Sequence, residues 1–314
     1  MEKELRQKAK ELLESGQVKF VIGFEAGTVP FKSSPLFAEN AEEADRLVWN
    51  PTCVNNLSVY LPDAAKKGKV AVVLKPCDAK NVVELFRENQ ISKDSVVTIV
   101  VSLPGIMKME ALDGIDLKTI QSIDWDKDGI VVKTTAGDVK IPAEKAFANK
   151  CQICEIGEPA LADIKIGDFG PRIARVSAMA SVEAYEKMSP TERRDFWTAQ
   201  FSKCIRCYAC RQACPGCYCK ECFVDKNGQV WASKATDPTA NWFFHMTRMM
   251  HQAGRCTGCG ECARACPVGI PLALMSLKMT DLVKNMFEFT PGAEGEEAPM
   301  LGHYEAKDPD PCPE

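Results

Sequence analysis

The chain has 314 residues, of which 46% are apolar, a length and composition that predict two folded domains and exclude a disordered chain. The net charge of -4 and the isoelectric point near 5.7 give no electrostatic reason to expect nucleic acid as a partner. Sixteen cysteines exceed what packing requires, and the charged amphipathic N-terminus is unlike a signal peptide. We therefore expect metal-binding thiols in a cytoplasmic protein rather than disulfides. No apolar run approaches the roughly 20 residues that cross a bilayer, so direct membrane insertion is not expected.

The first half of the chain alternates helical and strand patterns. Helices are expected up to Ser15–Gly16, at 41–48 and from about Ala79, and residues 50–61 are expected to form a turn that enters another helix. Continuous apolar strands are expected at 18–24, 69–74 and 95–101. Apolar strands that alternate with helices predict an α/β domain with a mainly parallel sheet covered on both faces. Residues 120–141 predict a small antiparallel hairpin that turns at Ala136–Gly137.

Four cysteines lie in this first half. Cys53 is expected in the first turn of a helix, and Cys77 in the turn before a helix that Asp78 caps. Both positions are element ends, where parallel sheets place their ligands. Cys151 and Cys154 form a Cys-x2-Cys pair. Four thiolates complete either a [4Fe-4S] cluster or a zinc site, whereas the alternative is that Cys53 and Cys77 are small buried packing residues.

Three stretches carry a resemblance: N-P-T-C-V-N-N-L at 50–57, K-P-C-D-A-K-N-V-V-E-L-F at 75–86, and C-Q-I-C at 151–154 with A-D-I-K-I-G-D-F-G at 162–170. They resemble the beta-subunit family of deazaflavin (coenzyme F420) hydrogenases and formate dehydrogenases. The resemblance implies a cluster held by Cys53, Cys77, Cys151 and Cys154. It also implies a possible flavin such as FAD, which moves electrons between clusters and a two-electron carrier. One departure is Leu103, which stands in V-S-L-P-G where members of the family often have a cysteine.

A second cysteine pattern occurs twice in the later part of the chain. C-I-R-C-Y-A-C-R-Q-A-C-P at 204–215 recurs as C-T-G-C-G-E-C-A-R-A-C-P at 256–267. This Cys-x2-Cys-x2-Cys-x3-Cys-Pro spacing is typical of proteins that hold two [4Fe-4S] cubanes, in which the fourth cysteine of each run binds the other cube. The first cube is therefore assigned Cys204, Cys207, Cys210 and Cys266, and the second Cys256, Cys259, Cys262 and Cys214. Two runs of identical spacing disfavour zinc as the alternative.

The 41 residues between Cys214 and Cys256 are too many for a small bacterial ferredoxin. Much of this insert, at 241–254, is expected to be helical. Residues 196–285 resemble the α-helical two-cluster ferredoxins of succinate dehydrogenase and heterodisulfide reductase subunits. His245 and His251 are six apart and do not share a helix face, so packing or hydrogen bonding near a cluster is expected of them rather than ligation.

Residues near the two runs leave further possibilities open. Cys217, Cys219 and Cys222 could form an additional zinc or cluster site with Cys312 or a partner residue, or they could be spare thiols. Five arginines could raise the potentials of anionic clusters or lie on the solvated surface: Arg206, Arg211, Arg248, Arg255 and Arg264.

These patterns predict an α/β cluster-binding and possibly flavin-binding domain at 1–180, a linker at 181–195, a mainly α-helical two-cluster domain at 196–285 and a flexible tail at 286–314. No nucleophile-base pair or phosphate loop is present. The predicted function is an electron-transfer subunit of an anaerobic oxidoreductase complex of hydrogenase, formate dehydrogenase or heterodisulfide reductase type, relaying single electrons between partner subunits. The alternative is a flavin-containing catalytic subunit that acts on a deazaflavin or nicotinamide coenzyme. A zinc-binding assembly factor is disfavoured by the paired runs.

Overall fold

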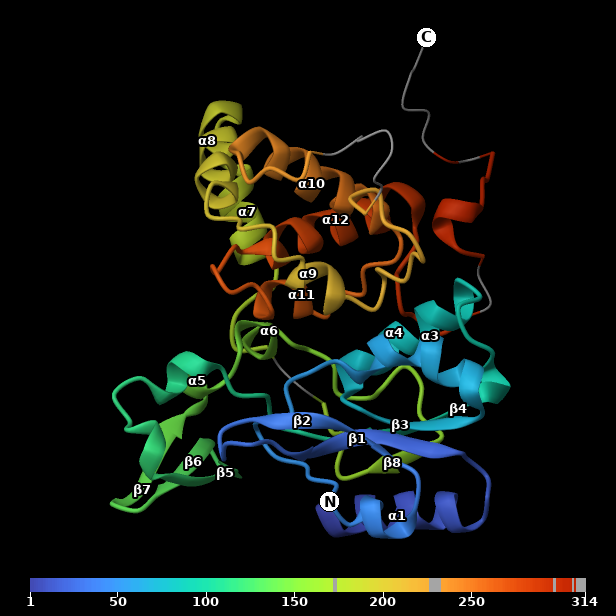
Figure 1. Ribbon diagram of the computed structural model, residues 1–314. Helices are drawn as coiled ribbons and strands as arrows, with labels where there is room; N and C mark the ends of the chain where they lie inside the picture. Colours follow the sequence, from blue (N-terminus) through green and yellow to red (C-terminus); the bar gives the residue numbers. More distant parts are fainter. Residues whose placement is uncertain (172–173, 226–232, 296–297, 307, 309–314) are drawn as a thin grey trace. The chain divides into compact units, whose positions relative to one another are not determined.

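The computed structural model describes residues 1–171, 174–225, 233–295, 298–306 and 308. Its chain divides into two compact units (Figure 1). The first unit comprises Met1–Val82 and Ile91–Val176, and the second comprises Val83–Gln90 and Ser177–Glu314. A short stretch from the first half of the sequence therefore belongs to the second unit.

A five-stranded sheet forms the centre of the first unit. Its strand order is β2 (Ser33–Ala38), β1 (Phe20–Ala26), β3 (Val70–Leu74), β4 (Val96–Val101) and β8 (Ile164–Ile166). The last four are parallel to one another, and β2 pairs antiparallel with β1 at the edge. Every residue of β3 and β4 is buried because helices cover both faces (Figure 1). One face is covered by α1 (Glu2–Glu14), and the other by α3 (Leu61–Ala64) with the start of α4 (Pro76–Arg87). The predicted α/β class with a mainly parallel sheet is confirmed, whereas the edge strand β2 was not predicted.

The helices of the first unit are short except for two. They are α1 (Glu2–Glu14), α2 (Ala41–Ala44), α3 (Leu61–Ala64), α4 (Pro76–Arg87), α5 (Ala143–Ala146) and α6 (Asn149–Gln152), with 3-10 turns at Leu57–Tyr60, Ala65–Lys67, Lys93–Ser95, Met109–Leu112 and Leu117–Thr119. Two predictions were wrong in detail. Cys53 lies in a turn before the first 3-10 helix and not within a helix. Helix α4 begins at Pro76, so Asp78 lies in its first turn, where it pairs with buried Lys75 at 2.6 Å instead of capping the helix.

A second sheet precedes the Cys151 segment. It has three antiparallel strands, β5 (Ile120–Asp126), β6 (Gly129–Thr134) and β7 (Gly137–Pro142), in place of the single hairpin that was predicted. The turn before Gly137 was foreseen, but the turn between β5 and β6 was not, although Asp128-Gly129 is a turn signal. Ile123, Ile130 and Val132 form its core with Phe147, which leads directly into α6 and Cys151.

The second unit is mainly helical, as predicted. Its helices are α7 (Ala180–Glu186), α8 (Pro190–Phe201), α9 (Ala209–Gln212), α10 (Pro238–His251), α11 (Glu261–Arg264) and α12 (Leu272–Phe287), with a 3-10 turn at Met300–Gly302. Ser189 and Glu192 cap α8 reciprocally, and Pro190 occupies its first position. The core gathers Trp197, Phe201 and Phe244 together with several cysteines. Among the described residues, no helix has the length and apolar character needed to span a membrane.

Candidate metal centres

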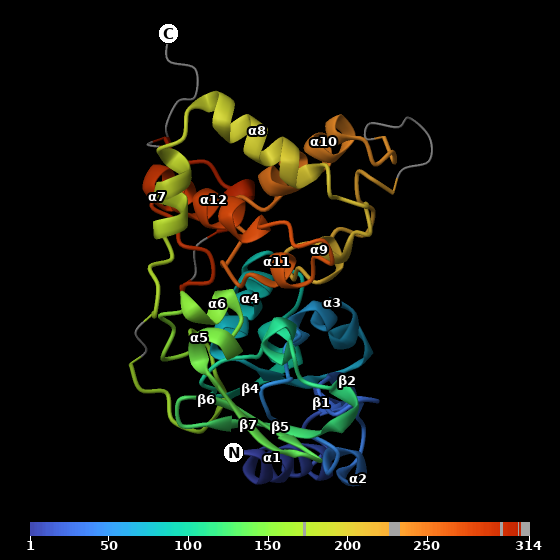
Figure 2. The same cartoon turned by 90° about the vertical axis from the view of Figure 1, so that its left-hand side faces the viewer.

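The two cysteine runs fold into loops of the same backbone shape. Arg206 and Tyr208 in the first run have φ of 56° and 58°, and Gly258 and Gly260 at the equivalent positions of the second have 72° and 69°. Helices α9 and α11 follow at equivalent positions, and they lie beside each other in both views (Figures 1 and 2). Left-handed residues alternating with right-handed ones form concavities of N–H groups that bind anions, including iron-sulfur clusters. The first loop keeps this conformation without glycine, which costs about 1 kcal/mol per residue.

The fourth cysteine of each run lies near two of the first three cysteines of the other run. Burial raises the pKa of Cys204 and Cys210, and the Cys266 thiol adds to both increases; for Cys210 the pKa is raised to about 11, with larger contributions from the Cys262 and Cys204 thiols than from Cys266. Burial likewise raises the pKa of Cys256 and of Cys262, the latter to about 11, and here the neighbouring thiol that adds to the increase is Cys214. This is the grouping that crossed ligation requires.

The donor set fits anionic iron-sulfur clusters. Thiols this buried would be unfavourable as free anions, whereas a metal binds the thiolate form and balances its charge. Arg248 of α10 is only 4% exposed, and its Nη2 donates to the Cys210 carbonyl at 3.0 Å. Burial alone would lower its pKa, but the thiols of Cys214, Cys217 and Cys262 outweigh burial and raise it. A buried cation needs a counter-anion, and ligated thiolates from both runs supply one.

The other four arginines have different surroundings. Arg206 is buried, bonds the Ala240 carbonyl and lies 4.7 Å from the Phe244 ring. The remaining three make ion pairs with carboxylates: Arg211 with Asp225, Arg255 with Glu88 and Arg264 with Glu261. Cysteine thiols are the charged neighbours that raise the pKa of Arg248, whereas for Arg211 and Arg255 the leading charged neighbours are the carboxylates of Asp225 and Glu88.

The His245 ring contacts Cys204, a predicted cluster ligand. Its Nε2 is 3.4 Å from the Cys204 sulfur, and its ring stacks on Phe201 with centroids 4.5 Å apart. Burial, with help from Arg248 and Arg206, lowers the pKa of His245 to about 4, so the ring is neutral at physiological pH. A neutral ring can donate from Nε2 to a thiolate. His251 instead packs edge-on against Phe223. Both rings therefore pack or bond beside the cysteine runs, as expected.

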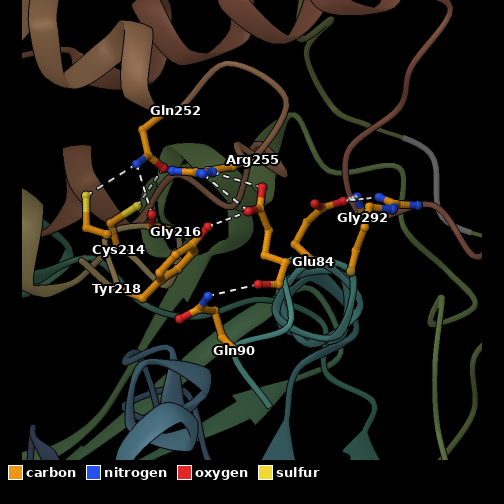
Figure 3. Close-up of polar contacts among 11 residues, drawn as sticks. Glu84, Gln90, Cys214, Gly216, Tyr218, Gln252, Arg255 and Gly292 are labelled. Atoms are coloured by element: carbon orange, nitrogen blue, oxygen red, sulfur yellow. Dashed lines mark hydrogen bonds and ion pairs between the residues drawn. The ribbon is translucent and has the colours of Figure 1, made fainter. Parts of the chain in front are cut away.

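The three additional cysteines have different neighbours. Cys217 accepts from Gln252 Nε2 at 3.4 Å, and a hydrogen bond from Cys214 lowers the pKa of Cys217 (Figure 3). Cys219 is exposed, and Cys222 lies beside Arg211. Within the part of the chain that the structure describes, no three His, Cys, Asp or Glu side chains are placed to hold a single metal ion. Cys312, the suggested fourth ligand, lies outside the described residues.

A carboxylate that was not predicted lies beside this segment. Glu88 accepts from Tyr218 Oη at 2.7 Å and from Arg255 Nε at 2.9 Å, and Arg255 also lies 5.2 Å from the Tyr218 ring (Figure 3). Glu88 thus connects the stretch that carries Cys217 and Cys219 with the residue before Cys256. Because these partners are more than a hundred residues apart, no local pattern could have revealed the contact.

The four cysteines of the first unit differ from one another in their neighbours. Cys53 is 1% exposed, and its sulfur lies 3.7 Å from the Ser33 hydroxyl and from the Val48 carbonyl. Burial raises its pKa to about 11. Its neighbours are oxygens, which suits a small buried thiol as well as a ligand.

Cys77, Cys151 and Cys154 share features of a cluster site. Burial raises the pKa of Cys77 well above its usual range, and the Asp78 carboxylate and the Cys154 thiol raise it further. The Cys154 thiol therefore lies near Cys77. The Ile106 N–H points at the Cys151 sulfur at 3.5 Å, the kind of N–H···S contact that stabilises cluster thiolates. An all-thiol donor set with such a contact fits an iron-sulfur cluster.

Comparison with known proteins identifies both halves of the chain. Residues 67–189 match the C-terminal domain of the coenzyme F420 hydrogenase/dehydrogenase beta subunit, and residues 200–270 match a 4Fe-4S dicluster domain. The chain is 28% identical to the F420-dependent formate dehydrogenase subunit beta of Methanocaldococcus jannaschii, over 93% of this chain and 92% of that protein. It is 27% identical to the F420-dependent formate dehydrogenase 1 subunit beta of Methanococcus maripaludis, over 93% and 91%.

A solved structure, the F420-reducing [NiFe] hydrogenase complex from Methanosarcina barkeri, contains a chain that is 20% identical with a TM-score of 0.38, over 48% of this chain and 62% of that one. That likeness is too low to carry an argument. The domain matches and the two full-length relatives confirm the resemblance drawn from the cysteine motifs. Residues 67–189 thus match the C-terminal domain of that beta-subunit family, residues 200–270 match a 4Fe-4S dicluster domain, and the chain as a whole is similar to beta subunits of F420-dependent formate dehydrogenases.

Proposed function

We propose that this chain is the iron-sulfur electron-transfer subunit of an F420-dependent formate dehydrogenase or a related hydrogenase complex. The observation that supports the proposal is that Cys266 lies near Cys204 and Cys210 of the first run, while Cys214 lies near Cys256 and Cys262 of the second. Two relatives that match over nearly their whole length are named as subunits of formate dehydrogenases that depend on coenzyme F420. Partner subunits would therefore handle formate or hydrogen.

Bound [4Fe-4S] clusters supply one-electron transfer, and the residues of the chain fix and insulate them. Cys204, Cys207, Cys210 and Cys266 would hold one cluster, and Cys256, Cys259, Cys262 and Cys214 the other. Aromatic side chains such as Phe201 and Phe244 pack around the first group and exclude water. A low-dielectric surrounding of this kind strengthens every charge and N–H contact that reaches the sulfurs.

We also propose a third [4Fe-4S] cluster in the first unit, with Cys53, Cys77, Cys151 and Cys154 as its ligands. The interaction of Cys77 with Cys154 and the N–H contact to Cys151 support this assignment. Cys53 is the member of the set whose sulfur contacts oxygens, so it is the ligand that mutation must test first.

A second candidate function adds a flavin. The relatives' names include coenzyme F420, which exchanges electrons in pairs, whereas each cluster exchanges one at a time. A flavin such as FAD can convert between the two modes. If the first unit binds it, the chain is itself the catalytic subunit that oxidises or reduces the deazaflavin; if a partner binds it, the chain is a relay.

Metal and flavin analysis of the anaerobically purified chain tests both candidates. About twelve irons and twelve acid-labile sulfides per chain, without flavin, would support three clusters and a relay. The same iron content with one released flavin would favour the catalytic alternative. About eight irons would remove the third cluster, and eight irons with one zinc would assign that site, or the Cys217 group, to zinc. A colourless protein without sulfide would overturn the electron-transfer proposal.

A further inference from the structure

Four polar side chains on one face of α10 are buried. Asn241, His245, Arg248 and Gln252 are 0%, 2%, 4% and 4% exposed, and the last caps the helix. Their spacing of four, three and four residues keeps them in one line along the helix. We call this line the α10 stripe. Burying four polar groups in a row is costly unless each one is bonded, so its partners should explain why it exists.

Every member of the α10 stripe bonds to a cysteine residue. Asn241 Nδ2 donates to the Cys204 carbonyl at 3.0 Å, and His245 Nε2 lies 3.4 Å from the Cys204 sulfur. Arg248 donates to the Cys210 carbonyl at 3.0 Å.

Gln252 forms the end of the stripe. Its Nε2 lies 3.4 Å from the Cys217 sulfur and 3.1 Å from the Gly216 carbonyl, while its Oε1 accepts from the Cys214 thiol at 3.4 Å (Figure 3). The α10 stripe therefore follows the first cysteine run in order, from its first ligand past its last. It also reaches the second group, because Cys214 is assigned to the second cluster.

Arg248 has the charge surroundings of a group that acts on clusters. Its nearest charged neighbours are the thiols of Cys214, Cys217, Cys262 and Cys210, of which Cys210 belongs to the first cluster group and Cys214 and Cys262 to the second. Its Nε has no hydrogen-bond partner among the described residues. The guanidinium is 4% exposed and lies 3.0 Å from the Cys210 carbonyl, so it is a buried cation beside ligand cysteines.

We propose that the α10 stripe sets the redox potentials of both clusters, with Arg248 acting on the two together and His245 acting on the Cys204 cluster alone. This inference rests on the proposed function. A reduced cluster carries one more negative charge than an oxidised one. A buried cation and N–H donors that face the ligand sulfurs therefore favour reduction and raise the potential. Both residues are positioning residues, since neither replaces a cysteine.

The test is a redox titration of the anaerobically purified full chain, poised with dithionite and mediators and followed by EPR. Arg248→Met removes the charge at similar length, and His245→Phe keeps the ring stacked on Phe201 but removes the nitrogen. Arg194→Met is the matched control, because Arg194 is an arginine of the same unit with a side chain 68% exposed. Iron and sulfide contents show whether each variant retains its clusters.

We expect Arg248→Met to lower both ferredoxin-domain potentials, each by at least a tenfold change in the reduced-to-oxidised ratio, which is about 59 mV for one electron. His245→Phe should lower one potential and leave the other unchanged, and Arg194→Met should change neither. Arg248→Lys retains the charge, so both of its potentials should stay close to those of wild type. Equal potentials in wild type, Arg248→Met and His245→Phe would overturn the inference.

Two further outcomes separate this inference from the proposed function. A wild-type chain without reducible clusters would overturn the function itself, whatever the variants do. If Arg248→Met fails to assemble its clusters, Arg248→Lys and His245→Phe decide: the inference stands if the histidine variant shifts one potential alone, and it fails if that variant shifts neither or both.

Discussion

The two cysteine regions of this chain differ in how their thiols are brought together. In the second unit, two loops of equal backbone shape carry the cysteine runs, and the fourth cysteine of each run lies near cysteines of the other. In the first unit, four cysteines come from separate elements and have unlike neighbours, oxygens around Cys53 and thiols near Cys77. The spacing of cysteines within a short run determines the first arrangement, whereas the second depends on how the sheet and its connecting segments fold.

Because of this difference, mutations test the role of a cysteine differently in the two regions. A ligand in a repeated loop has an equivalent in the other loop, so its role can be checked against a partner position. A ligand at the end of a strand or helix has no such equivalent, and its role must be separated from packing by experiment.

The largest effect should follow from loss of a crossed ligand. Cys266→Ser should cost the chain about four irons, because the Cys204 group loses its fourth thiolate, and the cluster of Cys256 should remain. Iron content and the remaining EPR signal measure this. Cys219→Ser is the control: that thiol is exposed and outside both groups, so its iron content should equal wild type. Loss of the Cys256 cluster in place of the Cys204 cluster would show uncrossed ligation.

The same kind of substitution tests the proposed cluster of the first unit. Cys77→Ser should lower the iron content from about twelve to about eight per chain while both ferredoxin-domain signals persist. Cys53→Ser should give the same loss if Cys53 is the fourth ligand. A Cys53→Ser chain that keeps about twelve irons would show that this buried thiol packs and that the fourth ligand lies elsewhere.

A smaller effect is expected where the second unit is held by polar contacts and not by thiols. Glu88→Gln should destabilise the chain by about 2–3 kcal/mol, because it leaves the half-buried Arg255 without its carboxylate and weakens the bond from Tyr218. Anaerobic urea unfolding measures the change. Asp63→Asn, which breaks an ion pair whose side chains are 65% and 89% exposed, should cost less than about 1 kcal/mol. Equal effects of the two substitutions would show that the Glu88 contacts add nothing.

The sequence predicted those parts of the fold and site that depend on neighbouring residues. The apolar runs at β3 and β4, the cap of α8 and the paired cysteine runs all follow from local pattern, and the structure contains them. The edge strand β2 was not predicted because it is only partly buried and Pro35 interrupts its strand pattern. Glu88 escaped because its partners are distant in sequence. The α10 stripe could have been found, since Asn241, His245, Arg248 and Gln252 have helical spacing among apolar neighbours.

The smallest expected effect is a pH dependence that belongs to the second unit alone. Glu84 accepts from the Gly292 N–H and pairs with Arg87, and burial raises its pKa from 4.5 to about 7 (Figure 3). Between these two pH values the folded chain keeps a proton on Glu84 that the unfolded chain has released. The resulting stability is complete below about pH 4.5 and is lost as the pH rises through about 7.

Unfolding free energies at about pH 6 and about pH 8 should therefore show a loss on the order of 1–2 kcal/mol in wild type that is absent in Glu84→Gln. The glutamine has nearly the same shape but cannot titrate, so it removes the pH term while keeping the side chain in place. Loss of the same size in both proteins would assign the pH dependence to other groups. It would also mean that Glu84 is ionised in the folded chain across this range, held so by Arg87 and the Gly292 N–H against the cost of its burial.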